Sequence, residues 1–192
     1  MRDVLLLIRH GQTDWNLEGR FQGAREVPIN AVGREQARRN GRVLPSLLGE
    51  HDWQFVASPL GRAQETMRII LENAGRPDQP FVTHDPLKEV CFGAWEARTL
   101  KELREADPEA VATRKRDKWN YVPPEGESYA MLAERFGEWF KTRQGRHVIV
   151  AHGGITRVAL HLLSGMPSAS VPQFFIPHDR IIAILDGKAL VI

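Results

Sequence analysis

The sequence predicts an α/β fold, a three-layer α/β/α sandwich with a mainly parallel central sheet. Short and largely apolar runs such as Val4–Ile8 and His147–Ala151 are typical of strands buried on both faces. Segments with apolar residues at helical spacing separate these runs. Strands that alternate with helices build a parallel sheet with helices on both of its faces.

Four strands and at least three helices can be located in chain order. The strands are expected at Val4–Ile8, Trp53–Ala57, His147–Ala151 and Arg180–Leu185. Apolar residues recur at helical spacing over residues 61–75, 128–143 and 154–165. Gly75 with Pro77 supplies a stop signal for the first of these helices, and Ser128 is a suitable N-cap for the second. Asn30 can cap a further helix after the first loop.

Length, charge and cysteine content limit the classes of protein to which this chain can belong. The 192 residues, of which 42% are hydrophobic, fit one domain over residues 1–192. A formal net charge of +2 is too small for a general nucleic-acid binder. The only cysteine, Cys91, cannot form an internal disulfide, and the first apolar run is too short for a membrane span. We therefore expect a cytoplasmic protein with no nucleic-acid and no membrane partner. The sequence leaves a homodimer open.

Basic side chains follow three of the predicted strands. Arg9 and His10 come directly after the first strand, and His152 comes after the strand His147–Ala151. Arg62 falls in the first turn of the helix that follows the strand Trp53–Ala57. Because ligands bind outside the carboxyl ends of parallel strands, we expect these two arginines and two histidines to converge at one edge of the sheet.

Converged cations repel one another unless an anion lies among them, and arginine suits bidentate recognition of phosphate. Gly11, Gly153 and Gly154 allow a close backbone approach, and helix N-termini add N–H groups. The sequence has neither the Gly-Lys-Ser/Thr of a nucleotide-binding loop nor a cluster of carboxylates for magnesium. We therefore expect a phosphoryl pocket built from protein cations, with no metal and no cofactor.

Four motifs in order, "LIRHGQTDWN", "ASPLGRAQET", "KEVCFGAWEA" and "VIVAHGG", resemble the histidine phosphatase superfamily, in its phosphoglycerate-mutase-like branch. The resemblance covers nearly the whole chain and implies the phosphoglycerate-mutase-like version of the sandwich. It implies three catalytic residues, namely His10 as the histidine that becomes phosphorylated, Glu89 as the acid that serves the leaving group, and His152. It also implies four residues that bind the phosphoryl group: Arg9, Asn16, Arg62 and Gly153.

The chemistry of these residue types agrees with such roles. A neutral imidazole is a good nucleophile, provided that one ring nitrogen of His10 donates to a carbonyl and leaves the other to face phosphorus. Arg9, Arg62 and His152 would stabilise charge on the phosphoryl oxygens. Glu89 would give a proton to the leaving group and later take one from water.

Several residues have plainer interpretations. Asn16 alone would be a turn residue, and Glu89 alone would be a surface acid. The remaining histidines show no metal-ligand spacing and are interpreted as structural or solvent-facing: His51, His84, His147, His161 and His178. His178 lies in a segment that departs from the usual pattern of the superfamily, so contact between His178 and the substrate stays an open question.

Residues 104–129 form the least regular part of the chain, with a cationic group, the aromatic residues Trp119 and Tyr121, and a Pro-Pro pair. Such a run is commonly a solvated helix face. The alternative is a short cap segment that covers the site and selects the non-phosphate part of the substrate.

The expected function is that of a phosphomonoesterase, which acts through a phosphohistidine on a small phosphorylated metabolite. The alternatives are a cofactor-dependent phosphoglycerate mutase and a non-catalytic sensor of phosphate ligands. Only 63 positions separate Glu89 from His152, whereas relatives with full mutase activity carry a long insertion there. A sensor would be expected to lack His10 or Glu89. The sequence does not indicate which phosphomonoester is the substrate.

Overall fold

A six-stranded sheet with the strand order β3-β2-β4-β1-β5-β6 forms the centre of the protein. The computed structural model describes residues 4–192. The strands are β1 (Val4–Arg9), β2 (Gln54–Ala57), β3 (Val82–Thr83), β4 (Arg146–Ala151), β5 (Ile181–Leu185) and β6 (Lys188–Val191). Four adjacent strands, β3, β2, β4 and β1, run parallel to one another. Strand β5 pairs antiparallel with β1, and β6 pairs antiparallel with β5. The prediction of a mainly parallel sheet is confirmed.

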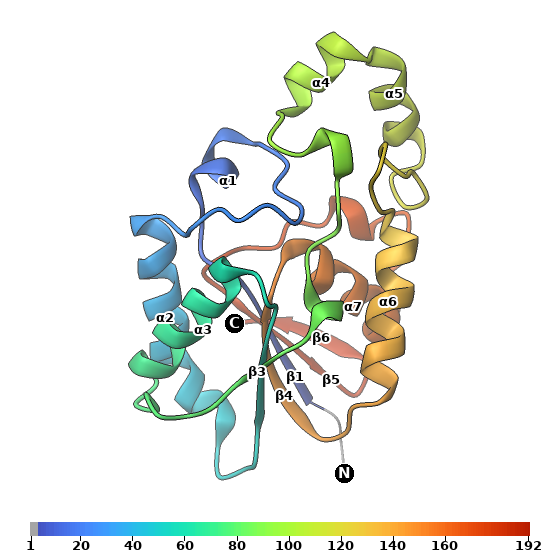
Figure 1. Cartoon of the computed structure of the whole chain (residues 1–192). Coiled ribbons are helices and arrows are strands. Elements are labelled where there is room, and N and C mark those ends of the chain that lie inside the picture. Colours follow the sequence, from blue (N-terminus) through green and yellow to red (C-terminus); the bar gives the residue numbers. More distant parts are fainter. Residues whose placement is uncertain (1–3) are drawn as a thin grey trace.

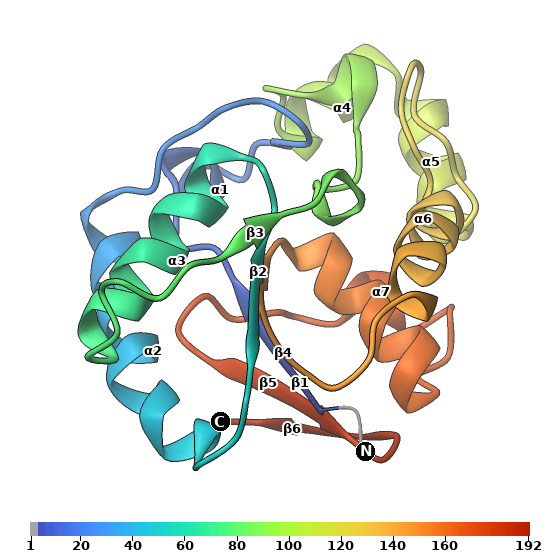
Figure 2. The ribbon, with the colours of Figure 1, turned by 60° about the horizontal axis from the view of Figure 1, so that its bottom comes forward.

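Helices cover both faces of this sheet, as Figures 1 and 2 show. The α-helices are α1 (Asp14–Glu18), α2 (Ala31–Leu48), α3 (Gly61–Asn73), α4 (Leu100–Ala106), α5 (Pro108–Arg116), α6 (Tyr129–Lys141) and α7 (Gly153–Ser164). Short 3₁₀ turns lie at η1 (Asp85–Leu87), η2 (Gly93–Trp95) and η3 (Val171–Gln173). Helices α2 and α3 pack on one face and α6 and α7 on the other, which confirms the three-layer architecture.

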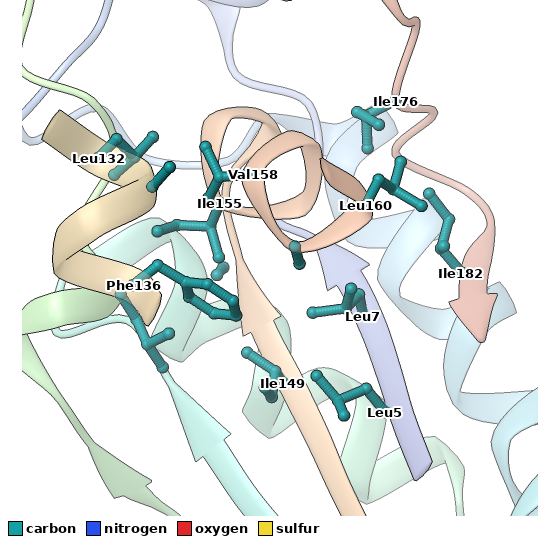
Figure 3. Close-up of a cluster of buried hydrophobic side chains, with 14 of the residues drawn as sticks. Leu5, Leu7, Leu132, Phe136, Ile149, Ile155, Val158, Leu160, Ile176 and Ile182 are labelled. Carbon is teal, nitrogen blue, oxygen red and sulfur yellow. The ribbon is translucent and has the colours of Figure 1, made fainter. Parts of the chain in front are cut away.

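Strand β1 shows why an uninterrupted apolar run forms a central strand. Leu5 and Leu7 point into the cluster under α6 and α7 (Figure 3), while Leu6 and Ile8 point into the cluster under α2 and α3. All four side chains are at most 3% exposed. Burial of one such side chain stabilises a fold by about 1.5–3 kcal/mol, so both helical layers hold this strand in place.

Side-chain caps fix the starts of two predicted helices. The Oδ1 of Asn30 accepts a hydrogen bond from the N–H of Gly33 at 2.9 Å. The hydroxyl of Ser128 accepts one from the N–H of Met131 at 3.2 Å. Such caps satisfy backbone donors that have no acceptor within the helix.

Strand β6 was not expected from the sequence. It follows a two-residue turn made by Asp186 and Gly187, which both have positive φ, at 49° and 73°. An Asp-Gly pair is a typical signal for such a hairpin. All four residues of β6 are exposed, so the strand lacks the apolar pattern that marks the other strands.

Helices α4 and α5 project beyond the carboxyl ends of the parallel strands (Figure 1). They were not expected individually, and residues 104–129 begin inside α4 and end at the first residue of α6. Asp107 ends α4 and caps α5, where its carboxylate accepts from the N–H of Ala110 at 2.9 Å. A small apolar cluster of Trp95, Leu103 and Val111 holds both helices against the motif KEVCFGAWEA, residues 88–97, called the acid motif below because it contains Glu89. None of the helices within residues 4–192 has the length and apolar character that crossing a membrane requires.

Candidate active site

The pairing of β1 with β4 brings the two predicted histidines together. Arg9 and Ala151 are register partners in these parallel strands, and His10 and His152 each follow by one residue. The N–H of His10 donates to the carbonyl of Ala151 at 2.9 Å. The centres of the two imidazole rings lie 5.2 Å apart.

A cavity of about 130 Å³ opens beside His10. Five of the predicted site residues line it: Arg9, His10, Asn16, Arg62 and Glu89. Its other lining residues are Arg20, Phe21, Gln22, Gly23, Phe92, Tyr129 and Arg157. The two remaining predicted residues adjoin it, since the His152 ring lies against His10, and a Cβ on Gly153 would lie 3.5 Å from Nε of Arg9.

His10 is held as a neutral ring with a free lone pair. Its Nδ1 lies 2.8 Å from the carbonyl oxygen of Gly11, and a carbonyl can only accept, so we assign the proton to Nδ1. Burial lowers the pKa of His10 well below its ordinary value, and the neighbouring His152 and Arg62 lower it further. The unprotonated Nε2 is therefore the nitrogen that can act as a nucleophile.

Two arginines are fixed by backbone carbonyls. Arg9 donates from Nη1 to the carbonyl of Ile176 at 2.8 Å, and Arg62 donates to the carbonyls of Arg25 and Gly23 at 2.7 and 2.8 Å. Burial lowers the pKa of Arg9 to about 10, so this guanidinium remains charged at neutral pH. Burial also lowers the pKa of Arg62. Within residues 4–192 the buried Nε of each arginine has no hydrogen-bond partner, nor has Nδ1 of His152.

Glu96 holds the loop that contains Gly23 and Arg25, whose carbonyls accept hydrogen bonds from Arg62. The carboxylate of Glu96 accepts from the N–H groups of Ala24 and Phe92 at 3.1 and 3.2 Å and pairs with Arg25 at 3.4 Å. Its side chain is only 7% exposed. Gly23 has a φ of 52°, and a Cβ there would lie 1.8 Å from Oε1 of Glu96. The close contact between this backbone and the Glu96 carboxylate therefore favours glycine.

Glu89 lies at the N-terminus of α7. Its Oε1 accepts from the N–H of Val90 at 2.9 Å and from that of Gly154 at 3.0 Å. A carboxylate is favourable there because the first N–H groups of a helix have no intrahelical acceptor. The acid motif and the second His-Gly motif are thus joined directly, and Glu89 is not an isolated surface acid.

Asn16 lies in α1 rather than in a turn. Its Oδ1 accepts from both the N–H and the hydroxyl of Thr13, each at 3.1 Å. Because the carbonyl end of the amide is occupied in this capping box, the NH₂ end is the part that can donate into the cavity.

The question of His178 is answered by a contact with the nucleophile's backbone. Its Nδ1 donates to the carbonyl of His10 at 2.6 Å, and its ring meets the ring of His10 edge-on, with centres 5.6 Å apart. Burial lowers the pKa of His178 to about 4, so the ring is neutral at pH 7. His178 therefore supports the loop of His10 and does not line the cavity.

The glycines were expected to allow backbone approach to a ligand; the contacts that the structure shows at Gly11 and Gly154 are of another kind. A Cβ on Gly11 would lie 2.3 Å from the carbonyl oxygen of Gly33, at the start of α2. A Cβ on Gly154 would lie 2.2 Å from Oε1 of Glu89. Both glycines instead permit close contacts within the protein.

Several polar residues at the site were missed in the sequence, among them Arg157, Tyr129 and Ser58. Arg157 donates to the carbonyl of Phe174 at 2.9 Å and lies 3.4 Å from the hydroxyl of Tyr129. Ser58 contacts His152. The available signal for Arg157 is its position four residues after Gly153, which places both on one helix face. In the described part of the chain, His, Cys, Asp and Glu form no group of three or more that could hold a metal ion.

Comparison with known proteins decides the family. Residues 5–187 match the family described as the histidine phosphatase superfamily, branch 1. The chain belongs to the histidine phosphatase superfamily. This confirms the resemblance of the four motifs to that superfamily.

Individual relatives carry two kinds of name. The histidine phosphatase is 32% identical to a 2,3-bisphosphoglycerate-dependent phosphoglycerate mutase of Methylorubrum populi, over 89% of this chain and 84% of that protein. It is 31% identical to an adenosylcobalamin/alpha-ribazole phosphatase of Escherichia coli K12, over 88% and 83%. A solved structure of a putative alpha-ribazole-5'-P phosphatase from Escherichia coli K-12 covers all of this chain and 95% of its own, with a TM-score of 0.82 and 27% identity.

Proposed function

We propose that this histidine phosphatase hydrolyses phosphomonoesters of small metabolites through a phosphohistidine on His10. One observation carries the proposal. Three buried nitrogens have no partner in the described chain, namely Nε of Arg9, Nε of Arg62 and Nδ1 of His152. All three belong to side chains close to His10, whose Nε2 is unprotonated. A buried donor without an acceptor is costly, and the oxygens of a phosphoryl group would satisfy such donors.

In the first step, Nε2 of His10 attacks phosphorus. The N–P bond forms as the bond between phosphorus and the ester oxygen breaks, and a protonated Glu89 gives its proton to the departing oxygen. In the second step, water attacks the phosphohistidine, its proton passes to the Glu89 carboxylate, and the N–P bond breaks to release inorganic phosphate. Together, the two steps return His10 and Glu89 to their starting states.

Charge stabilisation falls to Arg9, Arg62 and His152. Phosphoryl transfer is catalysed mainly by positioned cations and donors around the equatorial oxygens. The backbone carbonyls that hold the two guanidinium groups fix their orientation before substrate binds. The NH₂ group of Asn16 and the first N–H of α7, at Gly153, would add neutral donors.

The alcohol part of the substrate would extend toward Phe21, Phe92, Tyr129 and Arg157, which line the cavity together with Glu89. Residues 104–129 would act as a short cap beyond this side. Alpha-ribazole 5'-phosphate is a candidate substrate, since relatives of similar sequence and structure are named for it. The lone Cys91 supports a reducing, cytoplasmic setting.

The competing function is phosphoglycerate mutase, which several relatives are named for. A mutase must keep water away from the phosphohistidine while the intermediate reorients. The cap has only two short helices, α4 and α5, and its charged residues are largely exposed. We expect 3-phosphoglycerate with added 2,3-bisphosphoglycerate to release phosphate faster than it forms 2-phosphoglycerate, or to react poorly by either route.

The test measures both products at once. An enolase-coupled assay follows 2-phosphoglycerate, and a phosphate assay runs in parallel. A panel of phosphomonoesters, ranked by kcat/KM, then identifies the substrate class. Rapid isomerisation with negligible phosphate release would establish a mutase, and binding without turnover of any ester would favour the phosphate sensor.

A further inference from the structure

Ser58 connects the strand β2 to the second histidine. It follows β2 directly, is completely buried, and its N–H donates to the carbonyl of Val150 in β4 at 3.0 Å. Its hydroxyl oxygen lies 2.7 Å from Nε2 of His152. Ser58 belongs to the motif ASPLGRAQET, but no role was assigned to it above.

The hydrogen bonds of Ser58 define the direction of this contact. Its oxygen accepts from the N–H of Leu60 at 3.3 Å, so the hydroxyl still has one proton to donate. Within residues 4–192, Nε2 of His152 is the acceptor in reach of that proton. The opposite arrangement would leave a buried hydroxyl proton without an acceptor, which costs about 1–3 kcal/mol.

We propose that Ser58 is a positioning residue that holds the proton of His152 on Nδ1, so that this neutral histidine donates a hydrogen bond to the phosphoryl group. With Nε2 engaged as the acceptor from Ser58, a neutral imidazole must carry its proton on Nδ1. Nδ1 is the buried nitrogen that lacks a partner in the described structure. The inference rests on the proposed function.

The two histidines then perform different tasks because their partners differ. The carbonyl of Gly11 can only accept, and it leaves Nε2 of His10 unprotonated as the nucleophile. The hydroxyl of Ser58 donates, and it leaves Nδ1 of His152 protonated as a donor. Burial lowers the pKa of His152 well below 6.5, which agrees with a ring that carries a single proton.

The test is Ser58→Ala in protein labelled with ¹⁵N in histidine. In the wild type at pH 7.5, we expect the NMR signals of His152 to show a protonated Nδ1 and an unprotonated Nε2. In Ser58→Ala, we expect signal from the other tautomer. We also expect a loss in kcat that approaches the ~10²–10³-fold loss caused by removal of one oxyanion donor. Ser58→Thr retains the hydroxyl and should keep the wild-type tautomer; if its added methyl group prevents folding, Ser58→Cys replaces it.

Ser164→Ala is the matched control, since it removes a hydroxyl that donates to Leu160 at 2.7 Å near the other end of α7. It should change neither the tautomer nor kcat. An unchanged His152 tautomer in Ser58→Ala would overturn the proposal, whether or not activity falls, and so would a changed tautomer with wild-type kcat. Absence of phosphohistidine in the wild type would refute the proposed function instead, because the tautomer is read without turnover.

Discussion

The carboxylate of Glu89 and the backbone N–H of Gly154 lie 3.0 Å apart, although 65 positions separate them in the chain. This contact joins the proposed acid to the helix that follows the second histidine. The acid therefore keeps a fixed place relative to both histidines, since His152 is the N-cap of the same helix.

Glu89→Gln should slow the reaction selectively. A glutamine of similar shape can still accept from Gly154, but it cannot give a carboxylic proton. With alkyl phosphates we expect a loss of ~10²–10⁴ in rate, which is typical for removal of a general acid. With an aryl phosphate, whose leaving group needs little protonation, the first step should suffer less. Single-turnover rates for the two esters provide the comparison, and equal losses would make Glu89 a structural residue.

His10→Ala should abolish turnover and leave the fold intact, because His10 lies in the loop after β1 rather than in the apolar core. In the wild type, labelled substrate should leave phosphate on His10 that is labile to acid and stable to base. Circular dichroism verifies the fold of the variant. Turnover at the wild-type rate in His10→Ala would rule out the covalent intermediate.

Gly23→Ala should impair phosphate binding through Arg62. The added Cβ would meet the carboxylate of Glu96, so either this carboxylate or the loop must shift. Either shift disturbs the contacts that hold the carbonyl of Gly23 against Arg62. Gly75→Ala is a matched control, since Gly75 also has a positive φ, 71°, but a Cβ there has open space around it. Both variants should lose about 1–2 kcal/mol of stability from backbone strain. Only Gly23→Ala should raise KM and lower kcat.

His178 should make the fold sensitive to acid. Its pKa is about 4 in the folded state against an ordinary value of 6.5, so between these pH values the unfolded chain binds a proton that the folded chain does not. The contribution of His178 to the free energy of unfolding is therefore fully present above pH 6.5. It falls by up to about 1.4 kcal/mol per pH unit as the pH drops toward 4. Urea unfolding measured from pH 4.5 to 7.5 checks this. As the pH falls across this range, the free energy of unfolding of the wild type should decrease more than that of His178→Asn. Parallel pH curves for the two proteins would contradict the lowered pKa of His178.

Chelation should leave activity unchanged, since the proposed charge stabilisation comes from Arg9, Arg62 and His152. Vanadate, which imitates the five-coordinate transition state, should inhibit. Assays with and without EDTA and added magnesium check this. A strict requirement for magnesium would refute the proposed role of the arginines.

The sequence was sufficient to predict the strands that are buried on both faces and the site residues that directly follow them. Val4–Ile8 and His147–Ala151 are apolar on both faces, so their strands and the loops after them could be located, and with them His10 and His152. Strand β6 has no buried face, so periodicity could not reveal it. Ser58 and Arg157 look like ordinary turn and helix residues. Their places at the site depend on contacts with His152 and the carbonyl of Phe174, which only the assembled fold brings near.

The order of the strands has a consequence for folding during synthesis of the protein. Strand β1, which leads into the nucleophile, is flanked by β4 and β5, and both come from the last quarter of the chain. A nascent chain that ends before Arg146 already contains His10, Arg62 and Glu89, yet lacks both neighbours of its central strand. The catalytic centre can therefore assemble only after β4 and β5 have been made, and a chain that ends before Arg146 should be inactive and should expose the apolar residues of β1 to chaperones and proteases.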